Sequence, residues 1–204
     1  MLVIGKTTYP EGTQQKAAEM LRDALLRHYL GVSSGEVLFR DFKGRPRLRI
    51  PQADISTSHA GGIVFAALCF PDQRMRMDDE PLPCWIQVEE QEGSFCRIGI
   101  DIEPVSRANR DGRQRIADRW FDPEEAELLR RITDDEACRK AFLRIWTQKE
   151  SVCKMTGDGL SAIKTIHTMA LPDGISVTSS EIETSRGTYL CSICTDRRRQ
   201  VENI

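Results

Sequence analysis

Two amphipathic helical segments, each followed by strand-like segments, constrain the fold of this chain more than any other feature. The first helix is predicted for residues 13–30, where Gly31 ends it. Its apolar stripe comprises Ala17, Leu21, Ala24, Leu25 and Tyr29. A longer helix is predicted from a capping box of Thr133 and Glu136 to Gly157, a glycine typical of a helix C-terminus.

Strand-like segments fill most of the remaining chain, apart from a short helix predicted to begin at Asp122 and Pro123. Residues 55–62 read as a polar loop that leads into a buried apolar strand. The predicted strands are residues 36–49 (with a turn at Gly44 and Pro46), 63–70, 84–89, 94–104, 162–170, 174–183 and 187–195. Helix, strands, helix, strands is an α+β order, without the regular alternation of a doubly wound parallel sheet.

Composition excludes several classes of protein. The net charge of −2 is not that of a general nucleic-acid binder, and no run approaches the ~18 apolar residues of a membrane span. The N-terminal stretch is too short for a signal peptide. Seven irregularly spaced cysteines then indicate reduced thiols. We therefore expect a cytoplasmic protein with no nucleic-acid or membrane partner, in which Cys191 and Cys194 are packed thiols.

The segment IGIDIE, residues 98–103, carries a candidate metal site. The strand period of two places Asp101 and Glu103 on one face and Ile100 and Ile102 on the other. Two carboxylates one strand step apart can bind a hard cation, and Mg²⁺ prefers carboxylate oxygens completed by water and substrate phosphate. A half-buried strand with a solvated acidic face has the same alternation, so the pattern alone leaves both interpretations open.

Glu150 and His59 are two further candidate site residues. Phe142 and Trp146 lead at steps of four to Glu150, so an apolar stripe runs into a carboxylate. Glu150 and Lys154 also fit an ordinary i, i+4 pair on a solvated face. His59 lies in the hydroxyl- and glycine-rich stretch STSHAGG, which suits either an anion site or a capped polar turn.

Together these segments resemble the signature of the 4′-phosphopantetheinyl transferases. The signature is a Gly-hydrophobic-Asp strand, an aromatic-[Ser/Thr/Cys]-x-Lys-Glu-[Ser/Ala]-x-x-Lys helix and Gly-x-Gly-Leu. The matching residues are Gly99, Asp101, Glu103, Trp146, Thr147, Lys149, Glu150, Ser151, Lys154, Gly157, Gly159 and Leu160. Upstream, ISTSHAGG is similar to the family's serine-histidine loop and KGRPRL to its Gly-Lys-Pro turn. The resemblance extends from Phe42 to Leu160.

The resemblance implies an α+β fold of two similar α/β lobes, related by a pseudo-two-fold axis, with the active site between them. Residues 1–100 would form the lobe that holds the 3′-phosphate of coenzyme A. Residues 101–204 would form the lobe with the metal and the catalytic helix, and the two would make one compact unit. The length resembles the monomeric, surfactin-synthetase-activating type.

The resemblance also implies a reaction. The 4′-phosphopantetheine arm of coenzyme A would pass to a serine of an acidic apo acyl or peptidyl carrier protein, with Mg²⁺ or Mn²⁺, and 3′,5′-ADP would leave. Asp101, Glu103 and Glu150 would hold the metal, Glu150 would act as general base, and Lys154 would stabilise the pyrophosphate. The remaining coenzyme A contacts would come from Arg45, Arg47, Ser58, His59 and Lys149.

The chain departs from the family pattern in places, and two alternatives follow. Arg45 stands where the family usually has lysine, a basic segment before the first helix is not evident, and residues 71–93 form a longer excursion. One alternative is another Mg²⁺-dependent phosphotransferase, although the chain has no Gly-x-x-x-x-Gly-Lys-[Ser/Thr] loop. The other is a non-catalytic module that binds a carrier protein or coenzyme A, although all three carboxylates and Lys154 are present.

An arginine-rich segment, residues 106–119, begins three residues after Glu103. A solvated charged helix would explain it. Its position beside the metal strand favours a docking surface for an acidic carrier protein. The predicted contacts are Arg110, Arg113 and Arg115, with Val105 and Ile116 as apolar anchors.

Overall fold

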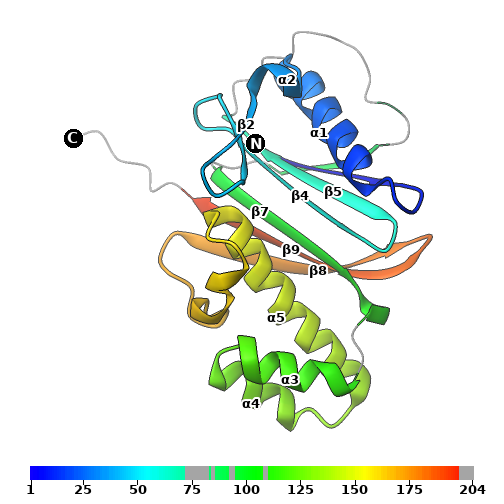
Figure 1. The fold of residues 1–204 in the computed structure, drawn as a ribbon, viewed down its shortest axis with the longest axis vertical. Helices are drawn as coiled ribbons and strands as arrows, with labels where there is room; N and C mark the ends of the chain where they lie inside the picture. Colours follow the sequence, from blue (N-terminus) through cyan, green and yellow to red (C-terminus); the bar gives the residue numbers. More distant parts are fainter. Residues whose placement is uncertain (72–82, 84–85, 92–94, 108–109, 198–204) are drawn as a thin grey trace.

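The computed structural model describes residues 1–71, 83, 86–91, 95–107 and 110–197. Two antiparallel sheets dominate it (Figure 1). The first has the order β4 (Asp54–Ala60), β5 (Ile63–Cys69), β1 (Leu2–Thr8) and β6 (Gln87–Gln91). The second has the order β7 (Phe95–Pro104), β9 (Gly187–Arg197) and β8 (Ile175–Thr184). The hairpin of β2 (Leu38–Arg40) and β3 (Pro46–Leu48) forms a separate two-stranded sheet, and β3 contacts β4.

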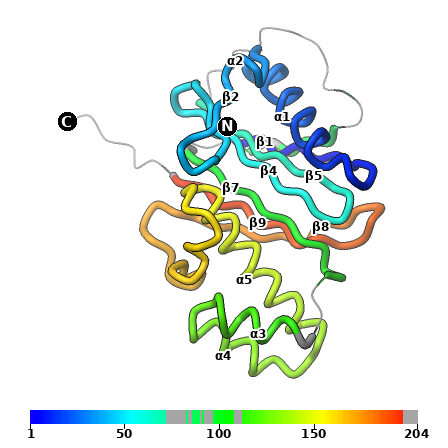
Figure 2. Tube along the Cα trace, viewed as in Figure 1, coloured from blue at the N-terminus to red at the C-terminus, as the bar shows by residue number. Residues whose placement is uncertain are grey.

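Helices cover the outer faces of the two sheets (Figure 2). They are α1 (Gln14–Leu30), α2 (Ser34–Val37), α3 (Arg110–Trp120), α4 (Pro123–Arg131) and α5 (Asp135–Thr156), with 3₁₀ turns η1 (Val105–Arg107) and η2 (Leu160–Thr165). The first helix, α1, packs on the first sheet, α5 packs on β7 and β9, and α3 and α4 pack against α5. The prediction of a mixed α+β fold is confirmed.

Strand β5 explains how the layers hold together. Its sequence IVFAALC is apolar throughout because both of its faces are buried. Val64, Ala66 and Leu68 pack into the core under α1. Ile63, Phe65, Ala67 and Cys69 pack into a second core, which lies between the two sheets.

Strand β7 divides its side chains in the way that the strand period predicted. Ile98, Ile100 and Ile102 enter the core between the sheets. The alternate residues, beginning at Gly99 and Asp101, face α5. The candidate carboxylates are therefore placed beside the helix that carries Glu150.

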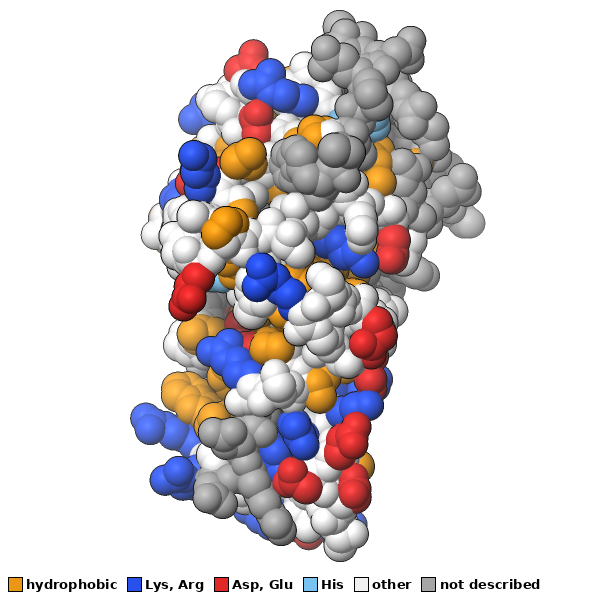
Figure 3. Space-filling model, turned by 90° about the vertical axis from the view of Figure 1, so that its right-hand side faces the viewer, with side chains coloured by type: hydrophobic (Ala, Val, Ile, Leu, Met, Phe, Trp, Pro, Cys, Tyr) orange, Lys and Arg blue, Asp and Glu red, His pale blue; other side chains and the backbone are white. Residues whose placement is uncertain are grey.

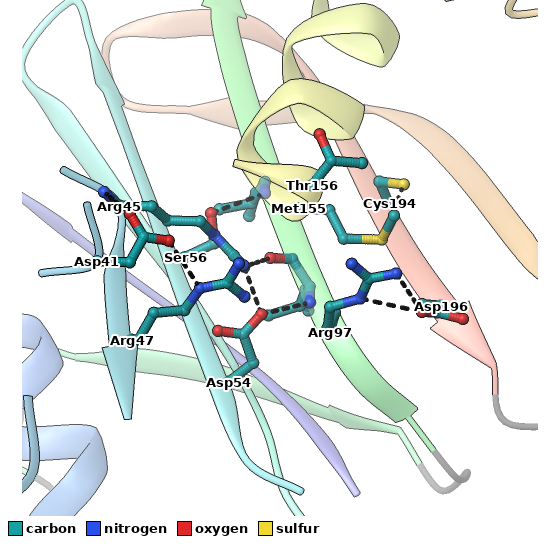
Figure 4. A network of polar contacts seen from close by, with 12 residues as sticks. Asp41, Arg45, Arg47, Asp54, Ser56, Arg97, Met155, Thr156, Cys194 and Asp196 are labelled. Carbon is teal, nitrogen blue, oxygen red and sulfur yellow. Dashed lines mark hydrogen bonds and ion pairs between the residues drawn. The ribbon is translucent and has the colours of Figure 1, made fainter. Parts of the chain in front are cut away.

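Side chains rather than a backbone ladder join the two sheets. The backbone N–H groups of Ile98, Ile100 and Ile102 donate to side-chain oxygens of Asp54, Ser56 and Ser58, at 3.0, 3.2 and 3.3 Å respectively. The edge strands β4 and β7 thus run side by side, and β4 presents a polar face to β7 (Figure 4).

Several local predictions were wrong. The expected polar loop at residues 55–62 is mostly strand β4, because its small polar side chains serve as acceptors for β7. The expected strand at residues 162–170 is instead η2 and a turn. Helix α5 is capped by Asp134, which accepts from the N–H of Ala137 at 2.7 Å, rather than by Thr133.

The predicted boundary between residues 100 and 101 falls inside β7. Most of the predicted excursion at residues 71–93 lies outside the described residues, which include β6 at its end. Strand β1 at the N-terminus was not predicted.

The composition predicted no membrane span and predicted that Cys191 and Cys194 are packed thiols. None of the helices in the described part of the chain is long and apolar enough to span a bilayer. Cys191 and Cys194 are free, buried thiols, and burial raises the pKa of each to about 12. Such thiols are poor nucleophiles and metal ligands, as expected for packed cysteines.

Gly99 is required for the close contact between β7 and α5. A Cβ atom there would lie 1.9 Å from the carbonyl oxygen of Ser151 and 2.6 Å from the backbone nitrogen of Met155. Gly99→Ala should therefore destabilise the protein by about 3 kcal/mol, measured by urea unfolding. Gly35→Ala is the control, because nothing lies within 4 Å of that Cβ position. Equal unfolding midpoints for the two variants would contradict the tight contact.

Candidate active site

Asp101 lies at the centre of a polar cluster between β7, β4 and α5. The ammonium of Lys154 donates to Asp101 Oδ1 at 2.6 Å and to Ser58 Oγ at 2.9 Å, and Ser58 donates to the same Oδ1 at 2.8 Å. Asp101 is only 3% exposed, and its second oxygen, Oδ2, is buried without a hydrogen-bond partner. A buried carboxylate oxygen without a partner is costly unless a further donor or a cation completes it.

Two further carboxylates belong to this cluster. Glu103 accepts from Arg107 at 2.7 and 3.0 Å, and its pKa is raised by burial and also by the charge of Asp101. Burial, followed by the charge of Asp101, raises the pKa of Glu150 to about 7, although Lys154 opposes the shift. The three carboxylates therefore repel one another in a desolvated setting.

This donor set fits a hard cation. Among the described residues, however, no group of three or more His, Cys, Asp or Glu side chains is placed so that it could hold a metal ion. Lys154 and Arg107 neutralise Asp101 and Glu103 in this arrangement. The oxygen of Asp101 without a partner and the raised pKa of Glu150 are both features that a divalent cation would relieve.

A cavity of about 500 Å³ adjoins the cluster. Glu150, Cys153 and Lys154 of α5 and the turn at residues 157–160 form one wall. The opposite wall comes from α1, the β2–β3 hairpin and β4. Its polar residues include Gln15, Arg22, Arg40, Lys43, Arg45, Ser56, Thr57 and His59. Apart from Glu150, the charged groups that line the cavity in the described part of the chain are all cations, so it suits an anionic ligand.

Of the predicted phosphate contacts, His59 lines this cavity, whereas Ser58 points the other way. Ile55, Ser56, Thr57 and His59 of β4 line the cavity, whereas the hydroxyl of Ser58 bonds to groups on β7 and α5. Because this hydroxyl already bonds to Asp101, Lys154 and the N–H of Ile102, Ser58 supports the carboxylate cluster instead. The predicted contact of Ser58 with the 3′-phosphate stays a prediction.

Arg45 and Arg47 are also engaged within the protein (Figure 4). Arg45 forms a buried ion pair with Asp54 and donates to the carbonyl oxygen of Ile98 at 2.9 Å. Arg47 pairs with Asp41 at 3.2 Å. Arg45 lines the cavity and its second terminal nitrogen has no partner, but its main function here is to tie the hairpin to β4 and β7.

Lys149, a predicted coenzyme A contact, is not among the residues that line the cavity. Its ammonium is fully buried, pairs with Glu125 at 2.8 Å and donates to the carbonyl oxygens of Ile163 and Ile166. Burial raises the pKa of Glu125, but hydrogen bonds from Lys149 and Thr168 outweigh this effect and leave the pKa lowered. Lys149 therefore anchors the segment after α5.

The arginine-rich segment is only partly available for docking. Arg113 is 4% exposed and pairs with Asp135, so it cannot steer a partner, contrary to the prediction. Arg115 and Ile116 are exposed, Val105 is half-buried, and the side chain of Arg110 lies outside the described residues. On the face drawn in Figure 3, side chains of both signs are interspersed.

The sequence did not single out Arg22, Arg40, Lys43 or Glu125. The helical period could have indicated that Arg22 is buried, since it lies one turn from Ala18 on the buried side of α1. Glu125 is the third residue of α4, a position typical of a capping residue. It does cap the helix, because it accepts from the backbone N–H of Asp122. Its contact with Lys149 joins residues distant in sequence and has no local pattern.

Comparison with known proteins agrees with this geometry. A model of the 4′-phosphopantetheinyl transferase superfamily matches residues 97–199, which include most of β7 and all of α5. The 4′-phosphopantetheinyl transferase HetI of Nostoc sp. (strain PCC 7120) is 30% identical over 154 residues, which are 73% of this chain and 54% of the relative. The chain thus spans about half the length of that relative. Because the family model covers half of the chain and both elements that carry the carboxylates, the chain belongs to the 4′-phosphopantetheinyl transferase superfamily.

Proposed function

We propose that the protein transfers the 4′-phosphopantetheine arm of coenzyme A to a serine of an apo acyl or peptidyl carrier protein. The observation that carries the proposal is the cavity between α1, β4 and α5, whose charged lining in the described part of the chain is cationic except for Glu150. The charges of Asp101 and Glu103 act on this Glu150 carboxylate. Family membership supports the reaction class. The two similar lobes, the monomeric state and the cytoplasmic location belong to the same proposal.

Each residue of the cluster has a distinct task in the proposed reaction. Glu150 accepts the proton of the carrier serine as its oxygen forms a bond to the β-phosphorus of coenzyme A. The bond to the leaving phosphate oxygen breaks, and 3′,5′-ADP leaves with the electron pair. Lys154 stabilises the pyrophosphate charge. A bound Mg²⁺ or Mn²⁺ ion, held by Asp101, Glu103 and Glu150, would supply charge neutralisation.

The carrier protein is proposed to approach over the end of β7, where η1 and α3 follow Glu103. Exposed Arg115 and Ile116 are suited to an acidic partner with an apolar contact. Contacts of this kind speed association and orient the partner more than they add affinity. Arg113, which is buried, stabilises α3 rather than docking the partner.

Mass spectrometry tests the function directly. We expect an apo carrier protein incubated with the protein, coenzyme A and Mg²⁺ to gain the mass of one phosphopantetheine arm. Excess chelator and Asp101→Ala should each abolish the gain, and added Mn²⁺ should restore it to the chelated protein. Binding of coenzyme A without transfer to any acyl or peptidyl carrier would favour the non-catalytic alternative. Full activity in chelator would contradict the metal assignment.

A further inference from the structure

The side chain of Ser58 joins strands β4 and β7 to helix α5 at the carboxylate cluster. Its hydroxyl donates to Asp101 Oδ1 at 2.8 Å, and it accepts from the ammonium of Lys154 at 2.9 Å and from the N–H of Ile102 at 3.3 Å. The residue is only 6% exposed. A hydroxyl has one hydrogen to donate and two lone pairs to accept with, so these three bonds use its full capacity.

The single hydrogen of this hydroxyl limits which ligand the side chain can hold. A phosphate oxygen accepts hydrogen bonds, so Ser58 could bind one only with the hydrogen that it gives to Asp101. A hydrogen bond to an ionised carboxylate is stronger than one between neutral groups. Breaking it would leave Asp101, which is 3% exposed, with one donor fewer in a desolvated setting. The bond to Asp101 is therefore the favoured use of this hydrogen.

The two carboxylate oxygens of Asp101 have different surroundings. Oδ1 accepts from both Ser58 and Lys154, whereas Oδ2 is buried and has no hydrogen-bond partner in the described part of the chain. A carboxylate that is fixed in this way offers one particular oxygen to a cation. Outer partners of this kind orient the carboxylates of metal sites, and their loss commonly lowers metal affinity or activity by roughly 10- to 100-fold.

The ammonium of Lys154 is held by the same hydroxyl. It bonds to both Asp101 and Ser58, and the lysine side chain also lines the cavity. Lysine has a flexible four-carbon stem, so a second anchor point restricts where its ammonium can lie. The contact with Ser58 therefore helps to keep this cation at the wall of the cavity.

We propose that Ser58 is a positioning residue for the transfer step, which leaves Oδ2 of Asp101 for the metal ion and keeps Lys154 at the cavity. The inference rests on the proposed function, in which Asp101 holds the metal and Lys154 stabilises the pyrophosphate. Ser58 then acts through these two residues and not on coenzyme A itself, unlike the phosphate contact that the resemblance implies. Its loss should affect turnover and Mg²⁺ binding far more than the affinity for coenzyme A.

Ser58→Ala tests the inference, with Ser56→Ala as its matched control. Ser56 also lies on β4 and accepts from an N–H of β7, that of Ile100 at 3.2 Å, but it has no described hydrogen bond to Asp101 or Lys154. Ser58→Ala should lower kcat, and also the Mg²⁺ affinity measured by calorimetry, by roughly 10- to 100-fold. Ser56→Ala should leave the Mg²⁺ affinity unchanged. Urea unfolding of both variants checks that each one folds.

Coenzyme A and its 3′-dephospho form separate this inference from a direct phosphate contact. Ser58→Ala should bind each of them as wild type does, and Ser58→Thr, which keeps the hydroxyl, should recover kcat. Weaker binding of coenzyme A alone, with normal Mg²⁺ affinity, would overturn the inference in favour of the phosphate contact. Equal Mg²⁺ affinities for Ser58→Ala and wild type would also overturn it. A wild type that modifies no carrier protein would instead overturn the proposed function and, with it, the role in the transfer step.

Discussion

Replacing Glu150 with glutamine should lower kcat for carrier modification by roughly 10²- to 10⁴-fold, the usual contribution of a general base. The amide has nearly the same shape but cannot accept the serine proton. Because this loss occurs mainly in the transition state, the affinity for coenzyme A should fall far less than kcat. Steady-state kinetics together with calorimetric binding would separate the two quantities. A variant that binds coenzyme A weakly but keeps its kcat would make Glu150 a ligand-holding residue instead.

The raised pKa of Glu150 predicts that Glu150→Gln also changes how the stability of the protein depends on pH. In the metal-free protein the carboxyl titrates at about 7, above its usual value of 4.5, because of burial and the neighbouring Asp101. The folded state therefore binds this proton more tightly than the unfolded state, and stability falls as pH rises from about 4.5 to 7. Glu150→Gln should remove this part of the pH dependence. NMR titration of the carboxyl should also show a lower pKa after Mg²⁺ is added, because an opposite charge favours the ionised form.

Lys149→Met should destabilise the protein by about 3–5 kcal/mol, because it leaves the charge of Glu125 buried without its partner. Both side chains of this pair are fully buried. The segment that follows α5 should also loosen, since Lys149 donates to Ile163 and Ile166 within it. Urea unfolding measures the first effect, and hydrogen exchange at residues 160–168 measures the second.

Two comparison variants make this prediction specific. Lys140→Met, on the same helix, removes an exposed pair with Glu181 and should leave the unfolding free energy nearly unchanged. Adding Glu125→Gln to Lys149→Met should recover part of the lost stability, because the amide oxygen still accepts from Thr168 and no charge stays buried. Normal stability of Lys149→Met combined with weak coenzyme A binding would instead restore the contact that the sequence predicted.

The sequence by itself determined the features that depend on local geometry. The strand period placed Asp101 and the isoleucines of β7 on opposite faces, and helix signals located α1 and α5 to within a few residues. The spacing of the signature also identified the superfamily, which the comparisons confirm. These inferences hold because a two-residue strand step and a helical turn leave few other placements for a side chain.

Only the tertiary structure decided which polar groups face the cavity. Lys149 and Glu150 are neighbours, but a helix turns about 100° per residue, so one is buried against Glu125 and the other lines the cavity. The hydroxyl of Ser58, a predicted phosphate contact, bonds to Asp101, and the guanidinium of Arg22 is buried beside Thr57. Each outcome depends on partners far away in sequence, because desolvation and pairing of a charge are set by whichever segments pack around it, and no local pattern records them.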